Sequence, residues 1–234
     1  MKTYIIHVST ATDREIHMLD LLKANPCLKA DWITEGDISS FNEEILNKYF
    51  SKNGMMNSQV SCALKHFLAL EKLVQSEEKY AIILEDDIIV NKDFCEKINL
   101  FVKEIDRRVL HPSVISLEDS NMKFIEASVR EKGVYLYKKD RVRFTGALLI
   151  DQLAAKNILN YVKTNKCNQP IDWFYDSLDK KGILKIYWSH PTIATQGSIN
   201  GNISTLIGNK RSGVFRFLSR HLQRFYKKII YHFR

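Results

Sequence analysis

The chain has 234 residues, enough for one domain of ordinary size, and its 45% hydrophobic and 26% charged residues exclude a disordered or collagen-like protein. The net charge of +8 is unevenly distributed. Eight of the 35 Lys and Arg lie in residues 210–234, which hold no acid, and the remaining 27 match the 27 acidic residues of the body. We therefore expect a globular domain over residues 1–209 and a separate basic tail, and no nucleic-acid-binding domain.

The four cysteines are widely spaced and form no CxxC pair, so we expect neither a zinc knuckle nor a thioredoxin-type motif. Cys27, Cys62, Cys95 and Cys167 are typical of single core residues in a reducing compartment. We expect no signal peptide, because Ser9 and Thr10 end the first apolar stretch. No window holds 18 consecutive apolar residues, so we also expect no transmembrane helix.

The first elements in chain order predict an α/β protein. A short β-rich segment over residues 3–8 leads into a helical pattern over about residues 14–24, the opening of a βαβ unit. Residues 57–76 form the clearest helix, since their apolar residues recur every three and four positions. Residues 80–84 form a continuous apolar run of strand length, as in a central strand covered on both faces.

The later elements follow the same alternation. The patterns predict strands over residues 88–90, 114–117, 134–137, 146–150 and 183–188, and helices from about residue 92, over 154–164 and over 172–180. Residues 195–213 contain four of the nine glycines among Ser, Thr and Asn, so we expect a mobile loop there.

Three adjacent acids, Glu85, Asp86 and Asp87, follow the apolar strand directly. They repel one another and cost stability unless a cation neutralises them. At the carboxyl end of a central strand they lie where open α/β sheets bind ligands, and in extended backbone Glu85 and Asp87 share one face while Asp86 points the other way. Paired carboxylates suit Mg²⁺ or Mn²⁺, which can bridge a diphosphate; a solvated acidic turn is the alternative.

A divalent cation with a diphosphate indicates transfer from a nucleotide-activated donor, because the cation offsets charge on the leaving group. A metal-dependent nucleotidyltransferase or hydrolase would use similar groups, and the triplet alone does not separate these classes.

Several segments together resemble glycosyltransferase family 25, a group of lipooligosaccharide glycosyltransferases that includes collagen galactosyltransferase domains. The segments are Tyr4-Ile5-Ile6-His7-Val8 with Asp13-Arg14, Ser58-Gln59-Val60-Ser61-Cys62-Ala63-Leu64-Lys65-His66, Leu84-Glu85-Asp86-Asp87, Thr145-Gly146-Ala147-Leu148-Leu149-Ile150 and Pro170-Ile171-Asp172. The helix segment departs from the family pattern G-E-I-G-C-A-L-S-H at Ser58, Gln59, Ser61 and Lys65. These departures concern donor-side details and leave the acidic motif intact.

The resemblance implies a Rossmann-like α/β fold of the GT-A type, a divalent cation (Mn²⁺ or Mg²⁺) and a UDP-sugar donor, with UDP-galactose ahead of UDP-glucose. It implies a lipid-linked oligosaccharide acceptor and inversion of the anomeric centre. Inversion requires one base that deprotonates the acceptor hydroxyl.

Several candidate site residues have a structural alternative, which for Arg14 is a surface salt bridge. Asp172 is the candidate catalytic base, or else a helix cap. Glu85, Asp87 and His190 are candidate metal ligands, and His190 is otherwise a loop histidine. The candidate donor-binding residues are Arg14, Glu85, Asp86, His66 and Gln196. For His66 a satisfied core histidine is the alternative. The aromatic side chains of residues 173–175 can stack on a sugar ring, although we expect at least one to be buried.

The basic tail repeats apolar residues every three and four positions with Lys and Arg between them, as in a basic amphipathic helix. We expect it to bind an anionic membrane surface, which implies a cytoplasmic protein peripheral to the inner face of the bacterial inner membrane. The alternative is a terminal helix packed on the body. A membrane-attached adaptor without catalysis is the non-enzymatic alternative for the whole chain.

Overall fold

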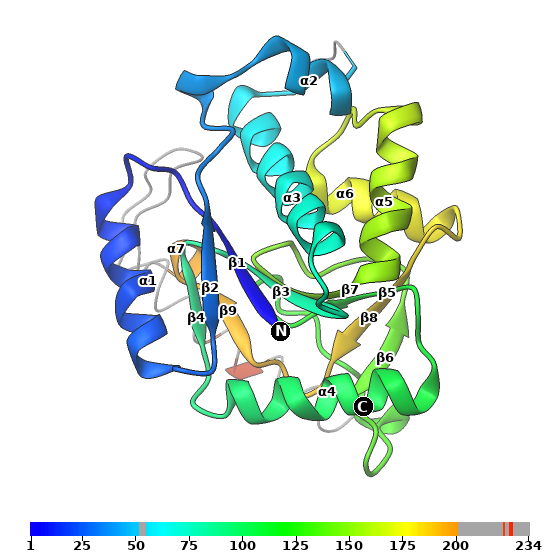
Figure 1. Ribbon diagram of the computed structural model, residues 1–234. Helices are drawn as coiled ribbons and strands as arrows, with labels where there is room; N and C mark the ends of the chain where they lie inside the picture. The colour runs from blue at the N-terminus through cyan, green and yellow to red at the C-terminus, as the bar shows by residue number, and fades with distance from the viewer. Residues whose placement is uncertain (52–54, 201–221, 223–224, 227–234) are drawn as a thin grey trace.

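The computed structural model describes residues 1–51, 55–200, 222, 225 and 226 (Figure 1). At its centre is a seven-stranded mixed sheet with the strand order β2-β1-β3-β7-β5-β8-β6. The strands are β1 (Lys2–Ile6), β2 (Lys29–Ile33), β3 (Tyr80–Glu85), β5 (Ser113–Ser116), β6 (Leu136–Lys139), β7 (Ala147–Asp151) and β8 (Lys185–Ser189). β1 pairs in parallel with β2 and β3, and β5 pairs in parallel with β8, whereas β7 and β6 run antiparallel to their neighbours.

Helices cover both faces of this sheet (Figure 1). On one face lie α3 (Asn57–Gln75), α5 (Gln152–Asn165) and α6 (Ile171–Lys180), and on the other lie α1 (Thr12–Ala24) and α4 (Phe94–Arg108). The remaining elements are α2 (Glu43–Tyr49), the four-residue α7 (Gly197–Asn200) and the 3-10 turns Ile38–Ser40 and Ala127–Val129. A second, two-stranded antiparallel sheet joins β4 (Ile88–Val90) to β9 (Ala194–Gln196).

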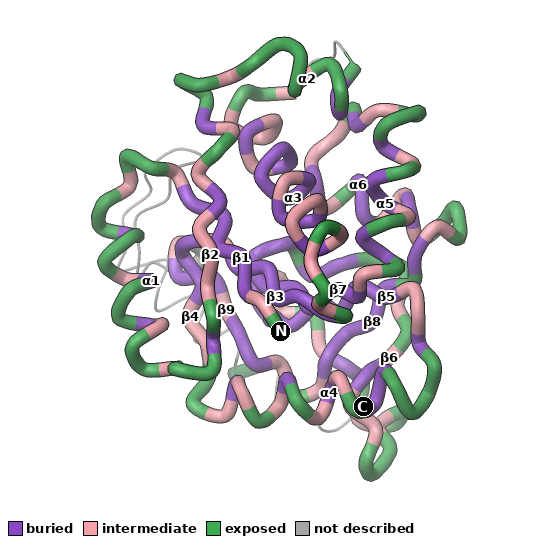
Figure 2. Tube along the Cα trace, viewed as in Figure 1, coloured by how far each residue is buried: buried purple, intermediate pink, exposed green. Residues whose placement is uncertain are grey.

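The core follows from the alternation of side chains along each strand. In β1, Tyr4 and Ile6 face the α3 side while Ile5 faces the α4 side. In β3, Ile83 and Leu84 divide in the same way, and both are fully buried. Figure 2 shows burial concentrated in the strands and α3, with exposed residues along α1 and α2. Each fully buried Ile or Leu contributes about 1.5–3 kcal/mol through removal of apolar surface from water.

The predicted α/β class is confirmed, and so are the most periodic elements. The helix expected over residues 57–76 is α3, and the strand expected over 80–84 is β3, with β1 and β7 on either side. β2 and α2 were not predicted, because their sequences carry weaker periodicity. The loop expected over residues 195–213 is wrong for its first part, because residues 194–200 form β9 and α7; residues 201–213 lie outside the described residues.

The expectation that all four cysteines are single core residues is wrong for two of them. Cys27 and Cys95 form a disulfide although 68 residues separate them, and their Cα atoms lie 6.4 Å apart. Cys27 precedes β2 and Cys95 lies in the first turn of α4, so the tertiary fold brings them together. Cys62 and Cys167 are free thiols.

Most of the basic tail lies outside the described residues. The three described tail residues, Leu222, Phe225 and Tyr226, are helical and about two-thirds exposed. Across the described part of the chain, no helix combines the length and the apolar character needed to cross a membrane.

Candidate active site

The acid triplet lies where β3 ends and the chain turns. β3 ends at Glu85, and Asp86 and Asp87 form the turn before β4. The N–H of Asp86 donates to the carbonyl of Ile6, 3.1 Å away, so the end of β1 lies beside the triplet. This turn changes the predicted arrangement: the strict alternation of faces in extended backbone does not continue past Glu85.

Asp86 is a buried anchor for the side chains that follow β1. Its Oδ2 accepts hydrogen bonds from His7 Nδ1 at 2.9 Å and from the Val8 N–H at 3.3 Å, and its Oδ1 accepts from Arg14 Nη1. Burial raises the pKa of Asp86, but the bonds from His7 and Arg14 outweigh burial and hold that pKa below its ordinary value. Asp86 is therefore ionised and fixes Arg14 against the triplet.

Asp87 is equally buried, with only 4% of its surface exposed, but its surroundings act in the opposite direction. Its Oδ2 accepts from the Ser198 hydroxyl and lies 3.7 Å from Arg14 Nη2. Its Oδ1 is buried and has no hydrogen-bond partner among the described residues. Burial, followed by the negative charge of Glu85, raises the pKa of Asp87 to about 6. An unpartnered carboxylate oxygen beside a second acid fits a cation.

Glu85 faces α3 and is held by two neutral donors. Its Oε1 accepts from the Thr145 hydroxyl at 2.9 Å, and its Oε2 accepts from Gln196 Nε2 at 3.0 Å. Gly146 makes the second contact possible: a Cβ at that position would lie 2.7 Å from Gln196 Nε2. The predicted donor residue Gln196 therefore reaches Glu85 through the pairing of β9 with β4.

Glu118 is a site residue that the sequence reasoning missed. It is fully buried, and its Oε1 accepts the Gly146 N–H at 2.7 Å. Burial, with the charge of Glu85 adding to it, raises the pKa of Glu118 well above its ordinary value. The missed signal is the one that identified Glu85, namely an acid directly after a predicted buried strand. His7 and Ser198, which bind Asp86 and Asp87, were also missed.

Asp172 lies in the first turn of α6 and is half-buried. Burial raises its pKa, and the charge of Glu85 adds to the increase, while backbone hydrogen bonds and His66 act against it. Asp172 is thus within electrostatic reach of Glu85 and His66. The neighbouring aromatics divide as expected: Trp173 is 61% exposed, whereas Phe174 and Tyr175 are buried.

His190 comes from a strand that is not a neighbour of β3 in the sheet. His190 follows β8 directly, and two strands, β7 and β5, lie between β8 and β3, so these two strands are about 14 Å apart across the sheet. Its ring meets Tyr137 at 6.4 Å, and burial together with the charge of Arg130 lowers its pKa to about 4. The contacts of His190 are thus with Tyr137 and the Tyr135 carbonyl, and its grouping with Glu85 and Asp87 stays a prediction.

The departures of α3 from the family pattern make structural contacts. Gln59 Oε1 accepts from the Met56 N–H at 3.1 Å and so closes the start of the helix. The Ser61 hydroxyl donates to the Gly36 carbonyl at 2.7 Å. The fully buried Lys65 donates to Asp37 and to the His7 carbonyl, which braces the end of β1.

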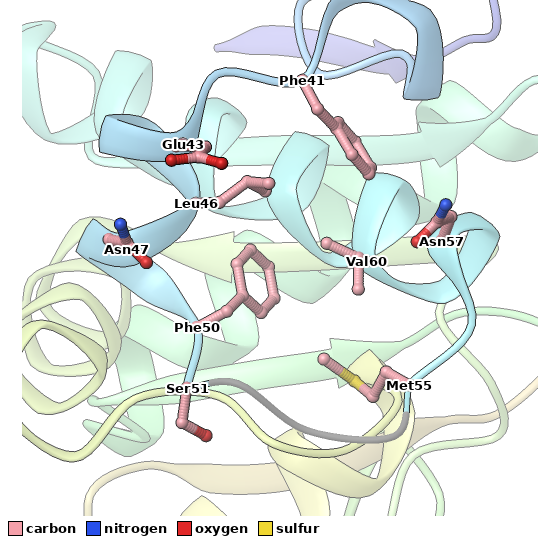
Figure 3. Close-up of a pocket in the computed structure, with 9 residues that line it drawn as sticks. All are labelled: Phe41, Glu43, Leu46, Asn47, Phe50, Ser51, Met55, Asn57 and Val60. Atoms are coloured by element: carbon pink, nitrogen blue, oxygen red, sulfur yellow. The ribbon is translucent and has the colours of Figure 1, made fainter.

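A pocket of about 320 Å³ lies between α2 and the start of α3 (Figure 3). Its lining combines apolar and polar side chains: Phe41, Glu43, Leu46, Asn47, Phe50, Ser51, Met55, Asn57 and Val60. The predicted site residues do not line it.

Comparison with known proteins decides the family. The sequence model of glycosyltransferase family 25 (LPS biosynthesis protein) matches residues 1–175, which is most of the chain. The chain belongs to this family. The suspected resemblance is thereby confirmed, and the protein is a glycosyltransferase by family. No curated protein matches the chain.

Three solved structures are distantly similar to this family 25 chain. Protein A197 from STIV is 11% identical and covers 91% of this chain and 100% of its own, with a TM-score of 0.42. A protein assigned as a glucose-1-phosphate thymidylyltransferase from Bacillus anthracis, in complex with sucrose, is 14% identical. The match covers 96% of this chain and 95% of that protein, with a TM-score of 0.43. Mouse xyloside xylosyltransferase 1, in its apo form, is 12% identical. The match covers 82% of this chain and 69% of that protein, with a TM-score of 0.39.

Proposed function

We propose that this family 25 protein transfers a hexose from a UDP-sugar to a lipopolysaccharide glycan acceptor. Galactose is the first candidate for the hexose and glucose the second. The observation that carries the proposal is the buried Asp87 oxygen without a hydrogen-bond partner, next to Glu85 at the carboxyl end of β3. Two acids in this position favour binding of a cation and a diphosphate.

Glu85 and Asp87 are the residues that would hold Mn²⁺ or Mg²⁺, and the cation supplies positive charge beside the leaving diphosphate. Arg14 lies against both Asp86 and Asp87 and offers a guanidinium to the donor phosphates. Gln196 and His66 lie on either side of Glu85, within reach of donor hydroxyls.

Asp172 is the base in this proposal. Its carboxylate takes the proton of the acceptor hydroxyl, the hydroxyl oxygen bonds to the anomeric carbon, and the bond from that carbon to the diphosphate oxygen breaks. UDP leaves from the opposite face, so the anomeric centre inverts. The raised pKa of Asp172 makes it a stronger base than an exposed carboxylate.

The acceptor is lipid-linked in this proposal, and the basic tail holds the enzyme at the inner face of the inner membrane. Eight cationic residues and no acid in residues 210–234 support that role.

The test is a donor screen with the purified full chain, Mn²⁺ or Mg²⁺, and a lipooligosaccharide acceptor, with release of nucleoside diphosphate as the readout. We expect UDP release that needs both cation and acceptor, and loss of that release in Asp87→Asn. Asp20→Asn, an exposed acid on α1, is the matched control and should behave as the unchanged protein.

Other outcomes would contradict the proposal. Release of pyrophosphate would indicate nucleotidyl transfer, and calorimetry with no cation-dependent binding of UDP would indicate an adaptor.

A further inference from the structure

One turn of α3 brings a thiol and an imidazole to the same carboxylate. Cys62 and His66 are four residues apart on the helix, and both face Glu85 at the end of β3. Cys62 Sγ lies 4.0 Å from Glu85 Oε1, and His66 Nε2 lies 3.7 Å from the same oxygen. The three ligand atoms all lie within 4.8 Å of one another.

His66 gives an independent reason to expect a ligand there. Its side chain is completely buried, yet neither ring nitrogen has a hydrogen-bond partner among the described residues. A buried polar atom without a partner costs about 1–3 kcal/mol. The edge contact with Tyr175, at 6.2 Å between ring centroids, supplies no hydrogen bond to either nitrogen. A bound cation would satisfy Nε2.

We propose that Cys62, His66 and Glu85 form a binding site for a thiophilic divalent cation, Zn²⁺. Sulfur, nitrogen and oxygen ligands together favour zinc, whereas Mn²⁺ and Mg²⁺ prefer oxygen alone. Tetrahedral zinc with ordinary bond lengths separates such ligand atoms by about 3.3–3.6 Å. The 4.0 and 3.7 Å separations from Glu85 Oε1 exceed this by a few tenths of an ångström, and the Cys62 and His66 atoms lie within 4.8 Å of each other, so cation binding draws the three side chains together.

Binding proceeds by exchange of a proton for the cation. The Cys62 thiol releases its proton to solvent, the sulfur bonds to zinc, and the neutral His66 Nε2 and the Glu85 carboxylate complete three positions. A water molecule takes the fourth. Thr145 and Gln196 keep Glu85 oriented, as outer partners of metal ligands do.

Zinc at this site also has a consequence that rests on the proposed function. Glu85 is shared with the proposed donor site, so zinc should compete with the donor's cation and inhibit transfer. Zinc binding itself does not depend on the glycosyltransferase reaction and is measured without nucleotide.

The first experiment uses Co²⁺ as a spectroscopic probe for zinc on the untagged full chain. We expect a thiolate-to-cobalt absorption band that one equivalent of Zn²⁺ removes. Cys62→Ser should abolish the band. Loss of a residue that only hydrogen-bonds to a metal ligand weakens metal binding about 10–100-fold. Cys62→Ser and His66→Gln each remove a ligand and should weaken zinc binding by more than that. Cys167→Ser removes the other free thiol and should retain band and affinity. A band that survives in Cys62→Ser, or is lost in Cys167→Ser, would overturn the proposal.

The second experiment needs no variant and so stands even if the substitutions prevent folding. Zn²⁺ should slow alkylation of Cys62 by iodoacetamide, measured by peptide mass spectrometry, and leave Cys167 unaffected. An unchanged Cys62 rate at saturating zinc contradicts the site.

The two proposals fail separately. Cys62→Ser should still transfer sugar with Mn²⁺ and resist inhibition by zinc. A cobalt band without any transferase activity would support the zinc site and contradict the proposed function. Transferase activity without the cobalt band would support the proposed function and contradict the zinc site.

Discussion

At the scale of single residues, Asp86 and Asp87 are adjacent acids whose pKa values move in opposite directions. Direct bonds from His7 and Arg14 lower the pKa of Asp86, whereas burial and the charge of Glu85 raise that of Asp87 to about 6. The difference comes from partners rather than burial, because both side chains are almost fully buried. Asp86 thus stabilises the fold as an anion, and Asp87 is poised for a cation.

The raised pKa of Asp87 predicts a pH-dependent stability. The folded state keeps the proton up to about pH 6, while the unfolded state releases it near the ordinary value of 3.8. The contribution to stability is therefore complete below about pH 3.8 and is lost as pH rises through 6, a change on the order of 2–3 kcal/mol. Asp87→Asn should be more stable than the unchanged protein in urea at pH 7.5, and this gain should shrink at pH 4.5.

Asp86→Asn is the matched control, because the lowered pKa of Asp86 has the opposite sign. Its stabilisation is present at neutral pH and is lost as pH falls through the folded pKa, so this variant should be less stable at pH 7.5. Equal effects from both substitutions would contradict the assignment.

Asp172→Asn tests the base. Loss of general-base catalysis should lower kcat by about 10²–10⁴-fold and leave UDP affinity, measured by calorimetry, nearly unchanged. Asp176→Asn is the control on the same helix, since Asp176 is held by the Val142 N–H at 2.8 Å. Near-normal transfer by a folded Asp172→Asn would remove this residue as the base.

At the scale of elements, the residue just before β7, Gly146, fits closely against β9 and β4. A methyl group added at Gly146 would lie 2.7 Å from Gln196 Nε2 and 2.9 Å from Ile88 Cδ1. Gly146→Ala should therefore displace Gln196 from Glu85 and raise the KM for the donor several-fold. In a Gln196→Ala background the same substitution should add little, and full additivity of the two effects would contradict this coupling.

The end of α4 offers a stabilising substitution far from the site. Val109 closes this helix in the left-handed conformation at φ 52°, with 73% of its surface exposed. A β-branched residue is strained there, and glycine is not. Val109→Gly should raise the free energy of unfolding by about 1 kcal/mol, a rise in Tm of about 2–4 °C. Val109→Ala keeps the Cβ and should give a smaller gain.

Elements with strong local patterns were predictable, and those that depend on partners were not. The periodic apolar residues of α3 and the apolar run of β3 are recognisable in the sequence, because burial of these elements requires apolar residues at those positions. β2 begins with the exposed Lys29 and is buried only at its last residue, Ile33, so its sequence carries no clear alternation. β9 has three residues and is held by partners distant in sequence, β4 on one side and the segment from Glu118 to Ser120 on the other.

At the scale of the whole molecule, the candidate site gathers Glu85, Glu118 and Asp172 from three distant segments. Sequence reasoning found Glu85 and Asp172 because each has a local motif. It missed Glu118, because neighbours across a mixed sheet depend on strand order, and the insertion of β7 between β3 and β5 is not visible in local patterns. The pairing of Cys27 with Cys95 was hidden for the same reason.

The uneven charge gives a prediction for the intact chain. A chain ending at residue 209 loses eight cations and no acid, so its body should be electrically balanced. Each cation near an anionic leaflet contributes on the order of 1 kcal/mol. The full chain should sediment with vesicles containing phosphatidylglycerol and dissociate as salt rises, whereas the shortened chain should stay in the supernatant.

Neutral phosphatidylcholine vesicles separate charge from apolar insertion as the cause of binding. The full chain should bind them far more weakly if the cations dominate. Transfer to a free, lipid-less sugar acceptor should be equal for both chains, because the tail acts on location and not on the reaction. Equal sedimentation of the two chains with anionic vesicles would show that the tail is not the anchor.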